Sequence, residues 1–440
     1  MRIGILPNLS PDSGGIYQYS KNILHALSAW SESQTGDRLV LLSNADHDFS
    51  ATPLEQDGWE IIPVVTGIRP PFRDRVLDGV RWAVGEGPHR DALRWLWRQF
   101  VSSRAGVRFN GRYSNFEVIR PHAELRQCFL STQLDLLLYP YPTPISFETG
   151  VPYVMAVHDL QHRLQPEFPE VSANGEWEYR EYLFRNGCRH ATLIVADSEV
   201  GKEDILGIYG RYGVTEDKIK VLPYLPATYL VREVSDTERQ RLRTTYHLPD
   251  RYLFYPAQFW PHKNHARIVQ ALSLLKREQH TNVPIVFCGS HSGSIRENTY
   301  NAVMSLRANL GMENEIYDLG YVPEEDMSAL YSGAVALVMP TFFGPTNIPV
   351  LEAWAFGCPV LTSDIRGIRE QAGDAAFLVN PRSVESIAEG IYRVWTDANL
   401  RCGLTSAGLH RLSSYTVDDF RNRLIEIVEE AKERVLFKAW

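Results

Sequence analysis

Four residues in the second half of the chain have the chemistry needed to hold a nucleoside diphosphate. Lys263, in PHKNH, stands at an expected helix start, where its ammonium and the free backbone N–H groups together suit a phosphate. The loop in FGPTNIPVLE can direct backbone N–H groups near Asn347 and Ile348 at an anion. Glu352 follows about one turn inside the next helix, where its carboxylate can accept paired hydrogen bonds from ribose hydroxyls.

Two further candidates follow expected strands in the first half. Gly14 and Gly15 form a glycine turn that leads into a helix, which also suits a phosphate; an ordinary strand-to-helix turn is the alternative. His158 ends YVMAVHD beside an acid and can contact a sugar hydroxyl or an acceptor, with a structural histidine as the alternative. His162 follows four residues later without a third ligand at helical spacing, so we expect no metal site.

These side chains can form one site only if the strands before them end at a common edge of a sheet. Short apolar runs rich in β-branched residues alternate with longer stretches of helical period, which is typical of parallel strands joined by helices. Seven such runs, from RIGILP to IKVLP, predict one sheet, and six more, from YLFYPAQ to AAFLVN, predict a second. We therefore expect an α/β protein of two doubly wound domains facing a cleft, with ligands beyond the carboxyl ends of the strands.

The change between the two groups of strands falls near residues 223–250. We expect a first domain over 1–225, a second over 226–415 and a closing helix over 416–440. Apolar residues of that helix recur near the helical period and form one face that needs a partner surface. They are Phe420, Leu424, Ile427, Val428, Ala431 and Val435.

One stretch, residues 66–126, differs in composition from the rest. It holds twelve arginines, no lysine and six acidic residues, with tryptophans interleaved. This composition suits contact with an anionic membrane surface or an anionic acceptor. The alternative is that the tryptophans fill the core of the first domain.

Composition narrows the class of protein. The 440 residues are 44% hydrophobic and 22% charged, which provides for packed cores, and the formal charge of -8 gives no global reason to bind nucleic acid. The five cysteines contain no CxxC pair, and no apolar run has the length of a signal peptide or a membrane span. We expect a cytoplasmic protein, with peripheral contact at the inner face of the membrane as an alternative.

Taken together, the glycine pair, the HD pair, PHKNH and FGPTNIPVLEAWAFGCPV resemble the retaining glycosyltransferase family 4, whose members have the GT-B fold. The resemblance covers nearly the whole chain. It implies a nucleotide-sugar donor in the cleft, held mostly by the second domain, an acceptor on the first domain, and no metal cofactor. It also implies that the closing helix crosses back onto the first domain.

The resemblance assigns roles by matching positions. Lys263 would bind the diphosphate, Glu352 the ribose, and the amides of the loop the phosphate and sugar. Gly15 would face the diphosphate or sugar, and His158 the transferred sugar. The backbone of Tyr321 and Val322 would contact the base. These roles make His158 and Lys263 the catalytic candidates.

Two positions depart from the family pattern. The family places a glutamate eight residues before the one that matches Glu352, and this chain has Gly344 there. The usual arginine, five residues before the phosphate lysine, is Gln258. Thr346 or Asn347 is a candidate to replace the lost sugar contact.

The hypothesis is a retaining, metal-independent hexosyltransferase that uses GDP-mannose or a UDP-hexose and a saccharide or lipid-linked acceptor, in bacterial surface glycan synthesis. Family members retain configuration by attack on the face from which the nucleotide leaves, so we nominate no catalytic pair of carboxylates. The alternatives are a catalytically silent nucleotide-sugar-binding subunit, a nucleotide-sugar 2-epimerase, and a metal-dependent transferase using Asp46 and Asp48. The absence of GxGxxG disfavours a dehydrogenase.

Overall fold

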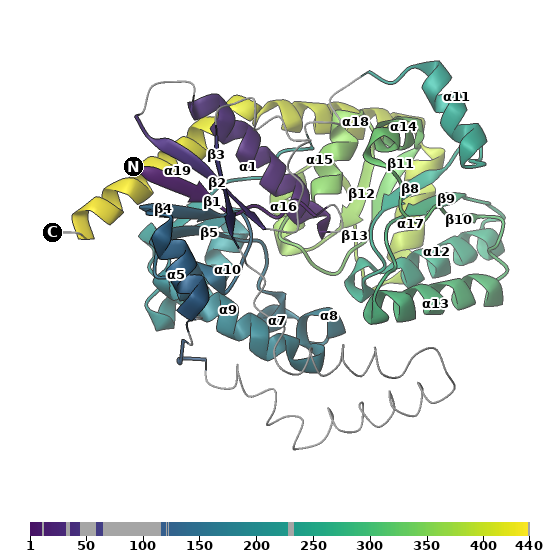
Figure 1. Cartoon of the computed structure of the whole chain (residues 1–440). Helices are drawn as coiled ribbons and strands as arrows, with labels where there is room; N and C mark the ends of the chain where they lie inside the picture. Colours follow the sequence, from purple (N-terminus) through teal and green to yellow (C-terminus); the bar gives the residue numbers. More distant parts are fainter. Residues whose placement is uncertain are drawn as a thin grey trace, which may run out of the picture.

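The chain folds into two parallel sheets with helices on their faces (Figure 1). The computed structural model describes residues 1–10, 13–31, 36–44, 59–64, 116–119, 121, 123–227 and 233–438. Over these residues every strand pairing is parallel. The predicted α/β class and both predicted groups of strands are confirmed.

The first sheet has the order β3-β2-β1-β4-β5-β6-β7. Its central strands are buried on both faces, as expected for near-continuous apolar runs such as LLLY and YVMAV. Its strands are β1 (Arg2–Ile5), β2 (Arg38–Asn44), β3 (Glu60–Val64), β4 (Leu136–Tyr139), β5 (Tyr153–Val157), β6 (Leu193–Ala196) and β7 (Ile219–Val221).

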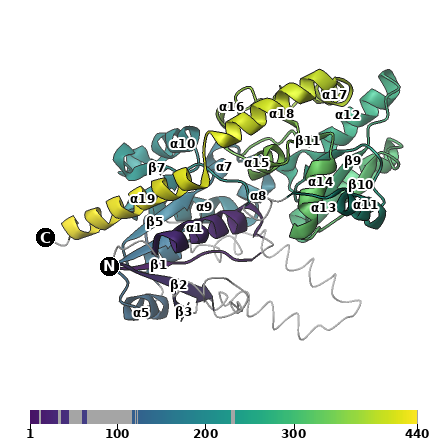
Figure 2. The ribbon, with the colours of Figure 1, turned by 90° about the horizontal axis from the view of Figure 1, so that it is seen from above.

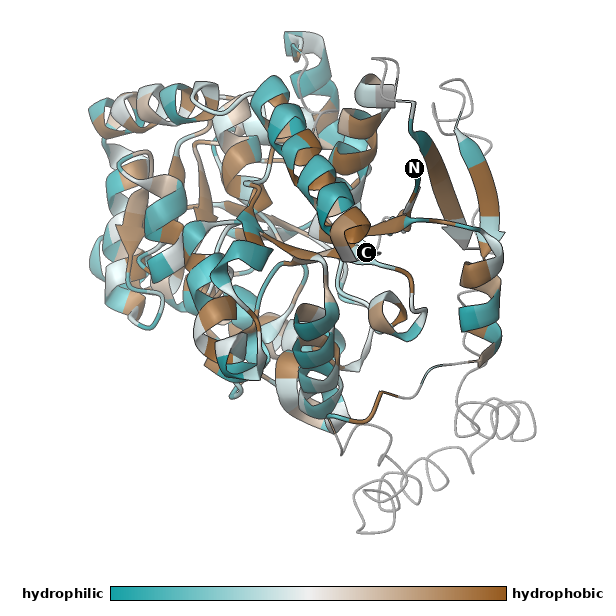
Figure 3. Ribbon diagram, turned by 90° about the vertical axis from the view of Figure 1, so that its left-hand side faces the viewer, coloured by the Kyte–Doolittle hydropathy of each residue, from teal (hydrophilic) through white to brown (hydrophobic). Residues whose placement is uncertain are grey.

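The second sheet has the order β10-β9-β8-β11-β12-β13 and belongs to one continuous apolar core. Figure 3 shows strands of the chain in brown among helices that carry both teal and brown residues, as expected for amphipathic helices on buried strands. Its strands are β8 (Leu253–Pro256), β9 (Ile285–Cys288), β10 (Ile316–Asp318), β11 (Ala336–Met339), β12 (Val360–Ser363) and β13 (Phe377–Val379).

Helices connect the strands and cover both sheets. In the first half they are α1 (Gly15–Ser31), α5 (Ala123–Ser131), α6 (Ile145–Glu148), α7 (Gln161–Leu164), α8 (Pro169–Ser172), α9 (Glu176–His190) and α10 (Glu199–Tyr209). In the second half they are α11 (Asp236–Thr245), α12 (His265–Glu278), α13 (Ser294–Asn309), α14 (Glu324–Gly333), α15 (Ile348–Ala355), α16 (Arg366–Ala372), α17 (Val384–Thr396), α18 (Ala398–Ser413) and α19 (Val417–Lys438). Short 3₁₀ turns are η3 (Ala173–Gly175), η4 (Gly210–Tyr212), η5 (Glu216–Lys218) and η7 (Pro261–Lys263).

Each sheet has one point where the strand order reverses. In the first sheet the chain moves outward from β1 to β3 and then returns to β4, which pairs with β1. In the second sheet it moves outward from β8 to β10 and returns to β11, which pairs with β8. Ligands of open α/β sheets bind in the crevice beyond the carboxyl ends of the strands at such a reversal. The loops after β1, β8 and β11 are therefore the positions to examine.

The closing helix α19 packs on the first sheet, as the family resemblance implies. Its residues Phe420, Leu424 and Ile427 are buried in a cluster shared with Ile3 and Ile5 of β1. Figure 2 shows α18 over the second domain and α19 continuing over the first, so the chain crosses back between the domains. The apolar face predicted from the helical period is thereby covered.

The arginine-rich stretch over 66–126 lies almost entirely outside the described residues. Its described part is 116–119, 121 and 123–126, where α5 begins. Asp46 and Asp48 of the alternative metal motif are also outside the described residues. Among the helices that are described, none is both long enough and apolar enough to cross a bilayer.

Candidate functional site

The two strand-order reversals face each other across the domain boundary. A Cβ placed on Gly14, which follows β1, would lie 4.0 Å from Nε2 of Gln258, which follows β8. A Cβ placed on Gly15 would lie 3.4 Å from Cδ1 of Ile348, which follows β11. Gly14 has a φ of +56°, a conformation that favours glycine. The structure thus brings together four of the residues that the sequence nominated.

A cavity of about 180 Å³ opens at this meeting point. Gly14 and Tyr17 line it from the first domain, and Gln258 and Val322 line it from the second. Tyr321, which is 62% exposed, completes the edge beside Val322. The residues expected at the base and at the glycine turn therefore share one cavity, whereas Lys263 and Glu352 are not among its lining residues.

Lys263 ends η7, directly before α12. The side-chain amide of Asn264 donates to the carbonyls of Pro340 and Pro381, each at 2.8 Å, and this ties the start of α12 to the loop after β11. Burial lowers the pKa of Lys263 to about 8, with the negative charges of Glu170 and Asp159 opposing that shift. A half-buried ammonium at a helix start can bind an anion, and the bound anion stabilises the protonated form of the lysine.

Glu352 lies in α15, and 6% of the residue is exposed. Burial raises the pKa of its carboxyl group to about 7, although the hydroxyl of Tyr331 donates to Oε2 at 2.6 Å. The negative charge of Glu324, which lines the cavity, adds to the rise. Glu352 is therefore within electrostatic reach of one residue that lines the cavity, although it does not line the cavity itself.

Some of the hydrogen-bonding groups in the loop before α15 already have partners within the protein. The backbone N–H of Asn347 donates to Oε1 of Gln371 at 2.9 Å, whereas Ile348, as the first residue of α15, has an N–H without an intrahelical partner. The side-chain Nδ2 of Asn347 is buried and has no hydrogen-bond partner. Thr346 donates its hydroxyl to Asp197 of the first domain. Of the two candidates for the lost sugar contact, Asn347 is the one with an unused donor.

Gly344 has a backbone conformation that a glutamate could adopt only with strain. Its φ is +118°, and a Cβ placed on it would lie 3.3 Å from both Nδ2 of Asn347 and the carbonyl oxygen of Thr346. This backbone conformation is strained for any residue with a side chain. The loop therefore has a backbone conformation at this position that disfavours a glutamate.

His158 lies at the cleft, but both of its ring nitrogens have partners. Nε2 is 2.8 Å from the carbonyl oxygen of Pro140 and must donate to it, which leaves Nδ1 to accept from the hydroxyl of Tyr224 at 2.6 Å. Burial lowers the pKa of His158, so the ring is neutral at pH 7. Its ring lines a narrow space together with Pro345 of the second domain. His158 is therefore held in place across the cleft from the loop.

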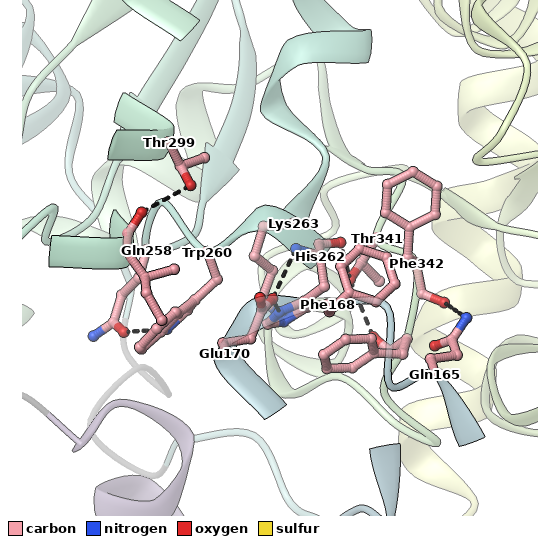
Figure 4. A network of polar contacts seen from close by, with 12 residues as sticks. Gln165, Phe168, Glu170, Gln258, Trp260, His262, Lys263, Thr299, Thr341 and Phe342 are labelled. Atoms are coloured by element: carbon pink, nitrogen blue, oxygen red, sulfur yellow. Dashed lines mark hydrogen bonds and ion pairs between the residues drawn. The ribbon is translucent and has the colours of Figure 1, made fainter. Parts of the chain in front are cut away.

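A segment of the first domain docks onto the second domain at this cleft. Glu170 of α8 accepts hydrogen bonds on Oε1 from the backbone N–H of His262 at 3.0 Å and from its Nδ1 at 2.7 Å. Phe168 packs against Phe342 and Phe343, with ring centroids 5.3 Å apart in both pairs. Figure 4 shows Glu170 and Phe168 reaching toward His262 and Phe342. Sequence reasoning did not identify this contact.

A metal site is not evident in the described part of the chain. None of its groups of three or more His, Cys, Asp or Glu side chains is arranged to hold an ion. His162, considered above as a ligand, is buried with its Nε2 3.2 Å from the hydroxyl of Tyr209 and 3.4 Å from Glu181. It is part of a structural cluster.

Comparison with known proteins identifies the second domain. Residues 236–410 match the family model described as "Glycosyl transferases group 1". The second domain is a group 1 glycosyl transferase domain. The resemblance to glycosyltransferase family 4 is confirmed at this level, and Gln258, Lys263 and Glu352 all lie within the matched residues.

Curated relatives extend the similarity. The chain is 26% identical over 259 residues to the O-antigen chain mannosyltransferase B of Escherichia coli, a match that covers 58% of this chain and 65% of that protein. It is 21% identical over 297 residues to the mannosylfructose-phosphate synthase of Agrobacterium fabrum, with 63% of each chain covered. The matches span less than two thirds of these relatives.

Solved structures show the GT-B fold over nearly the whole chain. HepE of Anabaena, in complex with UDP and glucose, has a TM-score of 0.67 and 18% identity, with 98% of this chain and 99% of that chain covered. The sucrose-phosphate synthase of Thermosynechococcus elongatus also has a TM-score of 0.67, with 15% identity and full coverage of both chains. The predicted two-domain fold is confirmed.

Proposed function

We propose that this chain is a retaining, metal-independent glycosyltransferase. It transfers a hexose from a nucleotide-diphosphate sugar to a saccharide or lipid-linked acceptor in the synthesis of a bacterial surface glycan. The observation that carries the proposal is the meeting of Gly14 and Gly15 with Gln258 and Ile348, because it places two strand-order reversals around one cavity.

In this proposal the second domain holds the donor. Tyr321 and Val322 border the base, Glu352 accepts hydrogen bonds from the ribose, and Lys263 with the start of α12 holds the diphosphate. Bound phosphate raises the pKa of Lys263 from about 8, so the ammonium stays charged as the leaving group forms. Asn347 offers its unused Nδ2 to the sugar.

The reaction then needs no protein nucleophile. The acceptor hydroxyl bonds to the anomeric carbon on the face from which the diphosphate leaves, and a diphosphate oxygen takes the hydroxyl proton. Charged hydrogen bonds to the departing diphosphate supply the stabilisation. The neutral, fixed ring of His158 orients the sugar from the first domain and does not transfer a proton, because both of its nitrogens are engaged.

GDP-mannose is the first donor to examine, and UDP-hexoses are next. The names of two relatives, a mannosyltransferase and a mannosylfructose-phosphate synthase, support mannose as the sugar. The complexes of HepE with UDP and UDP-glucose support UDP as the other carrier. O-antigen synthesis in the first relative supports a surface glycan acceptor.

The test is an assay of the purified chain with GDP-mannose or UDP-glucose and a panel of saccharide and lipid-linked acceptors. Mass spectrometry and anomeric NMR follow the product. The proposal expects a glycosylated acceptor with retained configuration, free nucleoside diphosphate in equal amount, and the same rate in excess chelator.

Each other outcome contradicts a defined part of the proposal. A rate that chelator abolishes contradicts metal independence, and an inverted product contradicts retention. Conversion of the donor without any acceptor indicates an epimerase. Tight donor binding with no turnover on any acceptor indicates a silent binding subunit.

A further inference from the structure

Arg296, in the first turn of α13, lies at the side of the cleft where Gln258 faces Gly14. Its Nη1 donates to Oε1 of Gln258 at 3.0 Å, and Nε1 of Trp260 donates to the same oxygen at 2.9 Å. The Arg296 guanidinium also lies over the Trp260 ring, 4.8 Å from its centroid. Figure 4 shows the Gln258 side chain beside Trp260, on the side of the second domain that faces the first-domain ribbon. The cation is therefore fixed in position by two neighbours.

The charge of Arg296 has no acidic partner in the part of the chain that the structure describes. Its polar contact is the neutral amide of Gln258, and its Nε is buried without a hydrogen-bond partner. By contrast, Arg180 binds Asp159 and Arg185 binds Glu181. A half-buried guanidinium that is held by an aromatic ring and an amide, with N–H groups to spare, is suited to an anion.

We propose that Arg296 is the second cation of the diphosphate site, and this inference rests on the proposed function. The guanidinium of an arginine at position 258 would lie close to the position of the Gln258 side-chain amide. Arg296 brings a guanidinium to within one hydrogen bond of that place from a different helix. Arg296 and Lys263 then bind the diphosphate together, and Gln258 acts as the support that aims Arg296.

The experiment measures the affinity of the full chain for UDP and GDP by calorimetry. Arg296→Gln removes the charge, and we expect about 10- to 100-fold weaker binding, because a charged hydrogen bond is lost. The double variant R296Q/Q258R returns an arginine to the neighbouring position, and we expect it to recover most of that loss. Arg296→Met is measured in parallel because it removes the charge but keeps an apolar stem over Trp260.

Arg307→Gln is the matched control, since Arg307 lies on the same helix and donates to the carbonyl of Glu313. It is expected to bind nucleotide as the wild type does. Unchanged affinity in R296Q and R296M overturns the inference while leaving the proposed function intact. A loss that Gln258→Arg does not recover also overturns it, since Arg296 would then act only by holding Gln258. A wild-type chain that binds no nucleotide overturns the proposed function itself.

Discussion

Glu170 and His262 lie in different domains and are joined through a single carboxylate oxygen that accepts two hydrogen bonds. Burial disfavours the charged form of Glu170, but the bonds from His262 outweigh it and lower the pKa of the carboxyl group. The side chain is 6% exposed. This pair therefore fixes α8 of the first domain against η7, the turn that carries Lys263.

Removal of this carboxylate is expected to loosen the turn. In Glu170→Ala the N–H and Nδ1 of His262 lose their acceptor, a loss of roughly 1 to 3 kcal/mol. Hydrogen exchange of the His262 amide should then accelerate by about 10- to 100-fold if local opening controls exchange. Glu167→Gln is the control, because its exposed pairing with Arg382 at 3.5 Å also crosses the domains. Equal acceleration in both variants would contradict a special role for Glu170.

Lys263→Ala is expected to reduce kcat/KM by about 10- to 100-fold through loss of a charged contact to the diphosphate. The wild-type kcat/KM should fall as the pH rises through about 8, because the free enzyme then loses the Lys263 proton. That alkaline limb should disappear in the variant. Lys276→Ala in α12, where Lys276 pairs with Glu315 at 2.8 Å, should leave the profile unchanged. An alkaline limb that persists in Lys263→Ala assigns it to another group.

Gly344→Ala is expected to destabilise the chain by about 1 to 3 kcal/mol, because the φ of +118° becomes strained and the new Cβ crowds Asn347. The KM for the donor should rise with it, since Asn347 is displaced. Gly403→Ala serves as the comparison, because a Cβ there meets no atom within 4 Å. Denaturant unfolding and donor kinetics measure both effects. If the two variants behave alike, the loop does not depend on glycine.

Asp197 is expected to make the free energy of unfolding depend on pH. Burial raises its pKa to about 7, with the hydroxyls of Thr346 and Ser198 opposing the shift. Between pH 3.8 and about 7, Asp197 is protonated in the folded state and ionised in the unfolded state. The free energy of unfolding therefore decreases as the pH rises through that range. Asp197→Asn should gain roughly 2 to 3 kcal/mol over the wild type between pH 5 and pH 8. Urea unfolding at both pH values checks this, and a pH-independent difference would contradict it.

The sequence predicts the scaffold well because the strands of both sheets are continuous apolar runs separated by helical periods. Gly14, Gln258 and Val322 can be found because each follows a strand, and parallel strands bring their carboxyl ends to one edge. The face of α19 is predictable for a similar reason, since Phe420 and Leu424 recur at helical spacing.

The remaining features depend on contacts between distant segments. Glu170 meets His262 across 92 residues and Thr346 meets Asp197 across 149, and no local pattern predicts either pair. His158 shows the same limit. Its position after β5 is visible in the sequence, but the partners that occupy its nitrogens, Pro140 and Tyr224, come from other loops.

The return of the chain through α18 and α19 restricts how the two domains can move. The outgoing connection at Pro223 to Pro226 and the returning one at Leu412 to Tyr415 line the same cavity of about 270 Å³. The two connections between the domains lie side by side. They permit rotation of one domain relative to the other about the line that joins them, and they oppose sliding and twisting of the domains. Rotation about that line would widen the cleft most at the edge farthest from the two links.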